Sequence, residues 1–165
     1  MIKMNAVTKK YLLFGGIGLV LGLIVSFVVL FISAPRLMMV EDQSKYDFEE
    51  TVERFEAEVL DAGWSIPGHH DMQAILESHG HDVLRVEIFE LCSSRYSAEI
   101  LELDDERIVS PLMPCRIAIY EKSDGNTYIA RMNNTLMARL FGGVIYDVME
   151  QASEETEAII DKLIK

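Results

Sequence analysis

The sequence predicts an α+β domain, a small sheet of about four strands with helices packed on it, preceded by one transmembrane helix. Two observations lead to this fold class. The first is an uncharged apolar stretch near the N-terminus, and the second is an irregular alternation of helical and period-two patterns in the rest of the chain. The expected organisation is a basic flank at 1–10, the membrane helix at 11–34, a polar tether at 35–46 and the α+β domain at 47–165.

The apolar stretch at 11–34 contains no Asp, Glu, Lys, Arg, His, Asn or Gln. As a helix it would extend over roughly 36 Å, which is enough to cross a hydrocarbon core of about 30 Å. A cleaved secretory signal is the competing interpretation, but its apolar core is usually only about 7–15 residues long. Pro35 would also follow directly on the one plausible cleavage point. We therefore expect the segment to contact membrane lipid and anchor the chain in the cell membrane.

Basic residues on the two sides of this helix predict its orientation. Lys3, Lys9 and Lys10 precede it, whereas Arg36 and Lys45 follow it with two acidic residues between them. The positive-inside rule then predicts a single-pass protein with a cytoplasmic N-terminus and a domain facing outside the cytoplasm.

Small residues within the helix suggest self-association. Gly18 and Gly22 form a Gly-x-x-x-Gly pair, which allows a second helix to approach closely. Glycine is also simply common in membrane helices, so dimerisation through this face is one of two interpretations.

The net negative charge of the domain argues against two other classes of partner, nucleic acid and anionic lipid. The chain has 15 basic and 27 acidic residues, and three of the basic ones precede the membrane helix, so the part after Ala34 has a formal charge of 12 − 27 = −15. We expect no nucleic-acid binding, because that requires a basic surface that follows phosphates. Electrostatic adhesion to anionic lipid is equally disfavoured.

The first elements of the domain are predicted to be helical. Asp47 with Glu50 resembles a helix cap, apolar side chains then recur at helical spacing, and Gly63 ends the helix. A short extended piece at 64–68 precedes a helix at 71–79 with Asp71 as its N-cap.

Strand patterns dominate the middle of the domain. Residues 84–92 alternate apolar and charged side chains, and Ser94 can cap a short helix after them. Strands at 115–122 and 127–132 flank an Asp-Gly turn. Asn133 or Asn134 can cap the next segment, and a final helix is expected at 144–165.

Histidines and cysteines are the candidate metal ligands. All four histidines lie between positions 69 and 81, and Cys92 and Cys115 lie at the ends of predicted strands. Imidazole and thiolate bind zinc, copper and haem iron, so a metal or haem is a possible cofactor, although the spacing matches no established signature. The candidate metal ligands are His69, His70, Cys92 and Cys115.

The cysteines allow three interpretations that the sequence leaves open. They can form a disulfide in an oxidising exterior, serve as ligands or redox groups, or act as small buried hydrophobes. Glu90, two residues before Cys92, would share its strand face and could raise the thiol pKa or add a ligand. The last prediction from these strands is that Cys92 and Cys115 lie close together at one end of the sheet, with His70 as the third member of the site.

The sequence lacks two common enzyme motifs, so it gives no support for catalysis. There is no Gly-x-Ser-x-Gly sequence, and Gly142-Gly143 lacks the lysine and strand context of a phosphate-binding loop. We therefore expect a role other than an enzyme.

Several segments together resemble the domain of unknown function 302 (DUF302) family. They are Glu90-Leu-Cys92-Ser-Ser-Arg-Tyr96, then Leu112-Met-Pro114-Cys115, then Arg131-Met-Asn133, and then Phe141-Gly-Gly143. The resemblance covers about residues 47–165. It implies a small α+β domain that self-associates as a homo-oligomer, and a shared ligand-binding pocket lined by His70, Glu90, Cys92 and Cys115. Ser93-Ser94 stands where the family usually has Asn-Pro.

These observations predict a membrane-anchored ligand-binding or sensory domain. The alternative is a thiol-based redox or metal/haem-binding protein that uses Cys92, Cys115 and His70.

Overall fold

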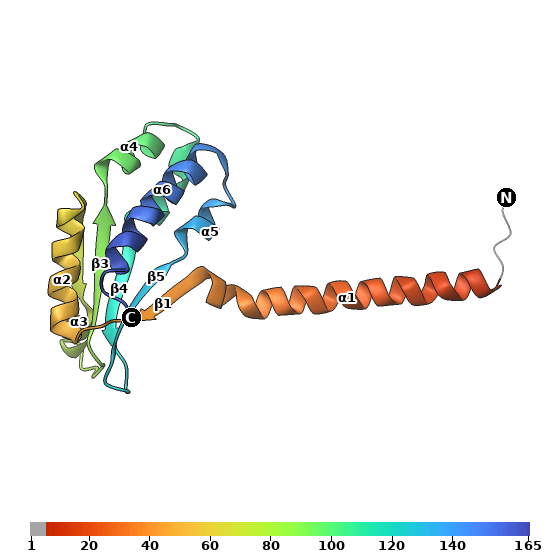
Figure 1. Cartoon of the computed structure of the whole chain (residues 1–165), viewed down its shortest axis with the longest axis horizontal. Coiled ribbons are helices and arrows are strands. Elements are labelled where there is room, and N and C mark those ends of the chain that lie inside the picture. The colour runs from red at the N-terminus through yellow and green to blue at the C-terminus, as the bar shows by residue number, and fades with distance from the viewer. Residues whose placement is uncertain (1–5) are drawn as a thin grey trace. The chain divides into compact units, whose positions relative to one another are not determined.

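The protein divides into two compact units, Met1–Leu37 and Met38–Lys165. The structure is a computed structural model that describes residues 6–165 (Figure 1). Lys3 and the first half of the predicted basic flank lie outside the described residues.

The described part of the N-terminal unit is a single long helix. Helix α1 covers Ala6–Met38 and continues through Pro35, so it extends beyond both ends of the predicted 11–34 segment. Its stretch Phe14–Met38 is 25 residues long with a mean hydropathy of 2.8. By length and composition, this helix can span a membrane.

The C-terminal unit contains a five-stranded antiparallel sheet in the order β1-β5-β4-β3-β2. The strands are β1 Met39–Gln43, β2 Ser65–Asp71, β3 Val86–Cys92, β4 Cys115–Glu121 and β5 Thr127–Met132. The α+β class is confirmed, but the estimate of about four strands is one too few. The additional strand, β1, lies in the predicted tether and pairs with β5 along its whole length. Its sequence, Met-Val-Glu-Asp-Gln, has no alternating apolar residues that would have predicted a strand.

Helices and one 3-10 segment connect the strands. They are α2 Phe48–Asp61, α3 Met72–Glu77, α4 Ser94–Leu101, η1 Glu106–Leu112, α5 Asn134–Ala138 and α6 Gly143–Ile160. The predicted caps Asp47, Asp71 and Asn133 each accept a hydrogen bond from a backbone N–H in the first turn. Capping by Ser94 is wrong, because Ser93 occupies the N-cap position of α4 and its side chain makes no capping bond.

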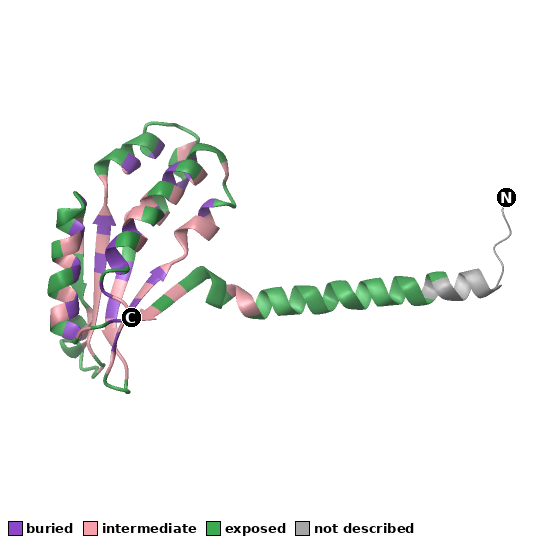
Figure 2. Cartoon of the chain, in the orientation of Figure 1, coloured by how far each residue is buried: buried purple, intermediate pink, exposed green. Residues whose placement is uncertain are grey.

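The core lies between the sheet and α2, α4 and α6 (Figure 2). Phe89 on β3 and Phe55 on α2 meet edge to face with ring centroids 5.2 Å apart, and both are fully buried. Ile117 and Ile119 on β4 and Ile129 on β5 continue this buried face. The alternation of apolar residues along these strands therefore determines which face of the sheet the helices cover.

One buried charge lies within this core. Arg131 on β5 is 5% exposed, and its Nη1 donates to Oδ2 of Asp42 at 2.6 Å. Its Nε donates to Oε1 of Glu157 at 2.8 Å, and its Nη2 also bonds that carboxylate. Arg131 thus joins β1, β5 and α6, which explains how a strand with few apolar residues is held at the sheet edge.

Candidate functional site

An apolar cavity lies at the end of the sheet where β3 finishes and β4 begins. Its volume is about 40 Å³. Cys92 and Cys115 are both in its wall. The other side chains that enclose it include Trp64, Leu91, Tyr96, Ile100, Met113, Val148 and Met149. Two thiols therefore share one water-poor space between the sheet, α4 and α6.

Strand pairing brings the two cysteines together. Leu91 on β3 lies directly opposite Cys115 on β4, so Cys92 is one residue out of register with Cys115. Opposed Cα atoms of antiparallel strands are about 4.5–5.5 Å apart, and an offset of about 3.3 Å gives a Cα separation of about 6 Å for the two cysteines. That separation falls within the range that disulfides bridge. Both cysteines are free in this structure.

The end of β3 redirects the Cys92 side chain. Strict alternation would place it on the opposite face from Leu91. Instead, its Sγ lies 3.4 Å from Oγ of Ser97 on α4, on the side of the sheet that the helices cover. The turn from β3 into α4 therefore lets Cys92 and Cys115 reach the same cavity.

The two thiols have different surroundings. Burial raises the pKa of the Cys115 thiol, and the nearby charge of Cys92 raises it further. Nδ2 of Asn134 donates a hydrogen bond to Sγ of Cys115 at 3.6 Å. At neutral pH, Cys115 therefore rests as a protonated thiol.

The carboxylate of Glu155 binds three side chains beside the cavity. Glu155 on α6 accepts hydrogen bonds from Nε1 of Trp64 at 2.9 Å, the Tyr96 hydroxyl at 2.7 Å and Nη2 of Arg95 at 2.9 Å. Burial acts to raise the pKa of Glu155, but the hydrogen bonds from Tyr96 and Trp64, together with Arg95, outweigh it and hold that pKa below its usual value. Glu155 therefore links α6 to both sides of the cavity.

This lowered pKa makes domain stability depend on pH. A carboxyl with a lower pKa in the folded state than in the unfolded state adds stability above about pH 4.3, and loses that contribution as the pH falls through its folded pKa. We expect Glu155→Gln to lower the melting temperature at pH 7, and this deficit to shrink below about pH 4. Thermal unfolding at both pH values measures it. The exposed neighbour Glu154 provides the control, Glu154→Gln, and an equal deficit at both pH values would contradict the prediction.

His70 and Glu90 lie together, outside the cavity. The carboxylate of Glu90 accepts from Nη2 of Arg116 at 3.0 Å and lies 3.6 Å from Nε2 of His70. His70 pairs with Ile88 on the face of the sheet opposite the core. Gly68 lies close beside this carboxylate: a Cβ there would lie 2.7 Å from Oε2 of Glu90, so a larger residue would require the Glu90 side chain to shift. The predicted four-residue pocket is thus two neighbouring groups, a thiol pair and a His–Glu–Arg cluster.

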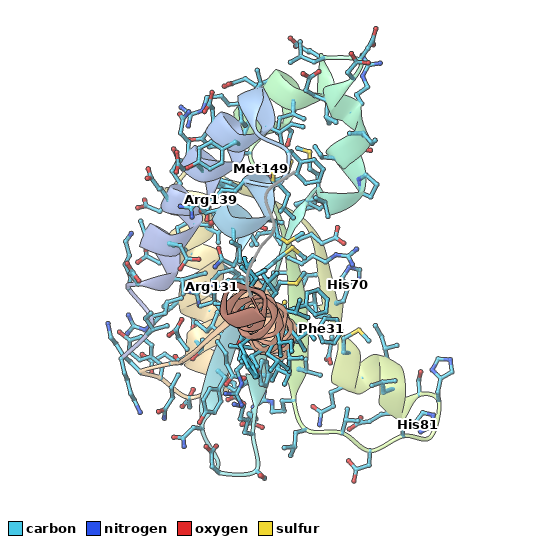
Figure 3. All side chains as sticks on the ribbon, turned by 90° about the vertical axis from the view of Figure 1, so that its right-hand side faces the viewer. Phe31, His70, His81, Arg131, Arg139 and Met149 are labelled. Carbon is cyan, nitrogen blue, oxygen red and sulfur yellow. The ribbon has the colours of Figure 1, made fainter. Side chains whose placement is uncertain are left out.

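The remaining histidines are dispersed. Nε2 of His69 lies 2.6 Å from Glu87, and the ring stacks on Phe89. Figure 3 shows His81 far out on the loop after α3, well away from His70. Within the part of the chain that the structure describes, no three His, Cys, Asp or Glu side chains are placed to hold a metal. The candidate ligands His69, His70, Cys92 and Cys115 are therefore not gathered at one point.

The volume of the cavity beside the thiols limits which cofactor could bind there. An engineered cavity of about 150 Å³ holds a benzene molecule. The cavity beside the thiols, at about 40 Å³, is much smaller, so a porphyrin does not fit there in this conformation.

Fold and site together define a two-layer α+β domain with a half-buried thiol pair at one end of its sheet. A family model described as domain of unknown function DUF302 matches residues 40–164. The chain therefore belongs to the DUF302 family. The match includes residues 40–43 of β1, which agrees with this strand being part of the domain.

A solved structure shares the fold. The crystal structure of an uncharacterized conserved DUF302 protein from Bacillus stearothermophilus is 19% identical, with a TM-score of 0.68. The alignment covers 76% of this chain and 97% of that chain. No protein with a curated description matches this chain.

Proposed function

We propose that this protein is a membrane-anchored redox-sensory domain in which Cys92 and Cys115 form a reversible disulfide. The observation that carries the proposal is the placement of two free thiols in one cavity, on adjacent ends of paired strands. A ligand-binding role receives less support, because pockets for small molecules are usually about 300–1,000 Å³.

The chemistry is thiol–disulfide exchange with an external disulfide. The Cys92 thiolate attacks one sulfur of that disulfide, forms a mixed disulfide and releases the first external thiolate. Cys115 then loses its proton and attacks the Cys92 sulfur, which releases the second external thiolate. The external disulfide gains two electrons, and the protein thiols lose two electrons and two protons. The hydrogen bond from Asn134 supports the Cys115 thiolate in the second step.

The position of the disulfide provides a readout. It would join the two ends of the segment that carries α4 and η1, and both elements line or flank the cavity. Oxidation would therefore restrain this segment, while reduction would release it. A partner that contacts this segment could then distinguish the two states, which is why a sensory role is proposed instead of catalysis.

Helix α1 supports a proposal for where the domain is located. Its length and apolar composition support a single-pass anchor in the cell membrane, and the lysines on the N-terminal side of its apolar stretch support a domain outside the cytoplasm. Disulfides form and persist in such a compartment. We further propose a homodimer, because the space beside Gly18 and Gly22 is open to a second helix.

The test combines redox state with accessibility in intact cells that express the full chain. After exposure to oxidised or reduced glutathione, free thiols are trapped with a maleimide that adds mass. We expect no labelling after oxidation and labelling of both cysteines after reduction, with an impermeant maleimide sufficient for the reduced protein. Cys92→Ser and Cys115→Ser should each keep one thiol that labels under both conditions. Labelling of both cysteines after oxidation would contradict the disulfide, and labelling only after cell lysis would contradict the orientation.

A further inference from the structure

An exposed apolar segment lies where the chain passes from α5 to α6. Leu140, Phe141 and Val144 are 76%, 45% and 42% exposed. Gly142 and Gly143, between them, have φ values of +69° and +55°, and this backbone turns the chain between the two helices. We call residues 140–144 the apolar tip. Single exposed apolar side chains are common on protein surfaces, but three within five residues form a patch that indicates a binding partner.

The apolar tip lies at the end of the sheet where β1 begins. Met39, the first residue of β1, pairs with Met132, the last residue of β5, and α5 begins two residues later at Asn134. The backbone N–H of Asn133 also donates to the carbonyl of Met38 at 2.8 Å. Figure 1 shows α5 and the segment after it at this end of the C-terminal unit, away from the hairpin between β4 and β5. The tip is therefore on the order of 20 Å from the first residue of the domain.

The same end of the domain is joined to the proposed membrane anchor. Helix α1 ends at Met38 and β1 starts at the next residue, so no linker separates the helix from the sheet. Arg36 is the first charged residue after the apolar stretch, and it would lie at the level of the lipid headgroups. The three residues that follow reach at most about 11 Å, whereas the headgroup layer is about 5–8 Å thick. Chain length alone therefore keeps the start of β1 within or next to this layer.

The charge of this segment permits close approach to lipid. The part of the chain after Ala34 carries all 27 acidic residues, yet none lies between Asp124 and Asp147. Among the described residues, no carboxylate lines the groove of about 210 Å³ where the ends of β1, β4 and β5 meet. Arg139, next to the tip, is exposed. The apolar tip thus lies within the longest stretch of the domain that has no acidic residue, and anionic headgroups would not repel its side chains.

We propose that the apolar tip inserts into the surface of the bilayer that α1 spans, with lipid acyl chains as its partner. Leu140, Phe141 and Val144 bury their side chains at the boundary between headgroups and acyl chains, while Arg139 extends to the headgroups. Because the tip is tethered close to the bilayer, insertion too weak to recruit a free domain is sufficient. The second attachment gives the domain one orientation toward the membrane. This inference rests on the proposed membrane anchor and does not depend on the disulfide.

The test uses single added tryptophans in the full chain, reconstituted into bilayers whose acyl chains carry bromine, which quenches nearby tryptophans. The one natural tryptophan, Trp64, is buried and provides the background. In Leu140→Trp and in Phe141→Trp, most of the added fluorescence should be lost in brominated lipid, and its emission should shift to shorter wavelength. Leu84→Trp is the matched control, because Leu84 is 54% exposed and precedes β3, at the opposite end of the sheet. Its added fluorescence should be unchanged by bromine.

A probe in α1 separates this inference from the anchor. Phe27 is 67% exposed, so Phe27→Trp should be quenched by brominated lipid if α1 spans the bilayer. Quenching of Phe27→Trp alone would overturn the insertion of the tip and leave the anchor intact. Absence of quenching in all variants would overturn both.

Two further outcomes would also overturn the insertion. Protection of Leu140→Trp and Phe141→Trp from aqueous iodide, without quenching by brominated lipid, would show that protein covers the tip, for example a second copy of the chain. Quenching of Leu84→Trp to the same extent as the tip variants would show that the domain contacts lipid without a preferred face.

Discussion

Replacing Arg131 with methionine is expected to lower the free energy of unfolding by about 3 kcal/mol, because removing one partner of a buried ion pair typically costs about 3–5 kcal/mol. Arg131 is 5% exposed, but its partners Asp42 and Glu157 are 36% and 39% exposed. Water can rehydrate these carboxylates in the variant, so the lower end of that range applies. For a domain of this size, the melting temperature should fall by about 10 °C.

A surface arginine provides the control for this prediction. Arg54 pairs with Glu50 one helical turn away, and their side chains are 51% and 44% exposed. Arg54→Met should therefore change stability by no more than about 0.5 kcal/mol. Denaturant unfolding of both variants measures the difference. Equal stabilities for the two variants would show that the Asp42–Arg131–Glu157 network does not hold β1 and α6 to the sheet.

The parts of the fold that were predictable are those with strong local patterns. The alternation in β3, β4 and β5 follows from burial of every second residue, so it predicts both the strands and the covered face. β1 escaped prediction because it is an edge strand, held by pairing with β5 and by Asp42, which bonds a side chain 89 residues away. Local periodicity does not encode such long-range contacts.

The site was predictable to a similar degree. The approach of Cys92 and Cys115 followed from their positions at the ends of neighbouring strands. The sequence did not predict the hydrogen bonds of Glu155, because they join it to Trp64 and Tyr96, which are 91 and 59 residues away in the sequence.

Oxidation of Cys92 and Cys115 to a disulfide is expected to stabilise the domain by about 3 kcal/mol. The bond would close a loop of about 24 residues, and the lost entropy of the unfolded chain accounts for a gain of this size. Thermal unfolding of the oxidised full chain in detergent should therefore occur about 10 °C above that of the reduced chain.

The variants Cys92→Ser and Cys115→Ser distinguish the effect of the disulfide on stability from the effect of the packing around the two thiols. Cys92→Ser should abolish the difference between oxidising and reducing conditions, and Cys115→Ser should do the same. Both sulfurs lie in the wall of an apolar cavity, so each variant should also lose some stability in its reduced form. A redox-dependent shift that persists in either variant would arise elsewhere in the protein, and would contradict the bond.

Equal stability of oxidised and reduced wild type, despite complete bond formation, would mean that native-state strain offsets the entropic gain. In that case the segment carrying α4 and η1 would have to change conformation on oxidation, and amide hydrogen exchange in this segment would report that change.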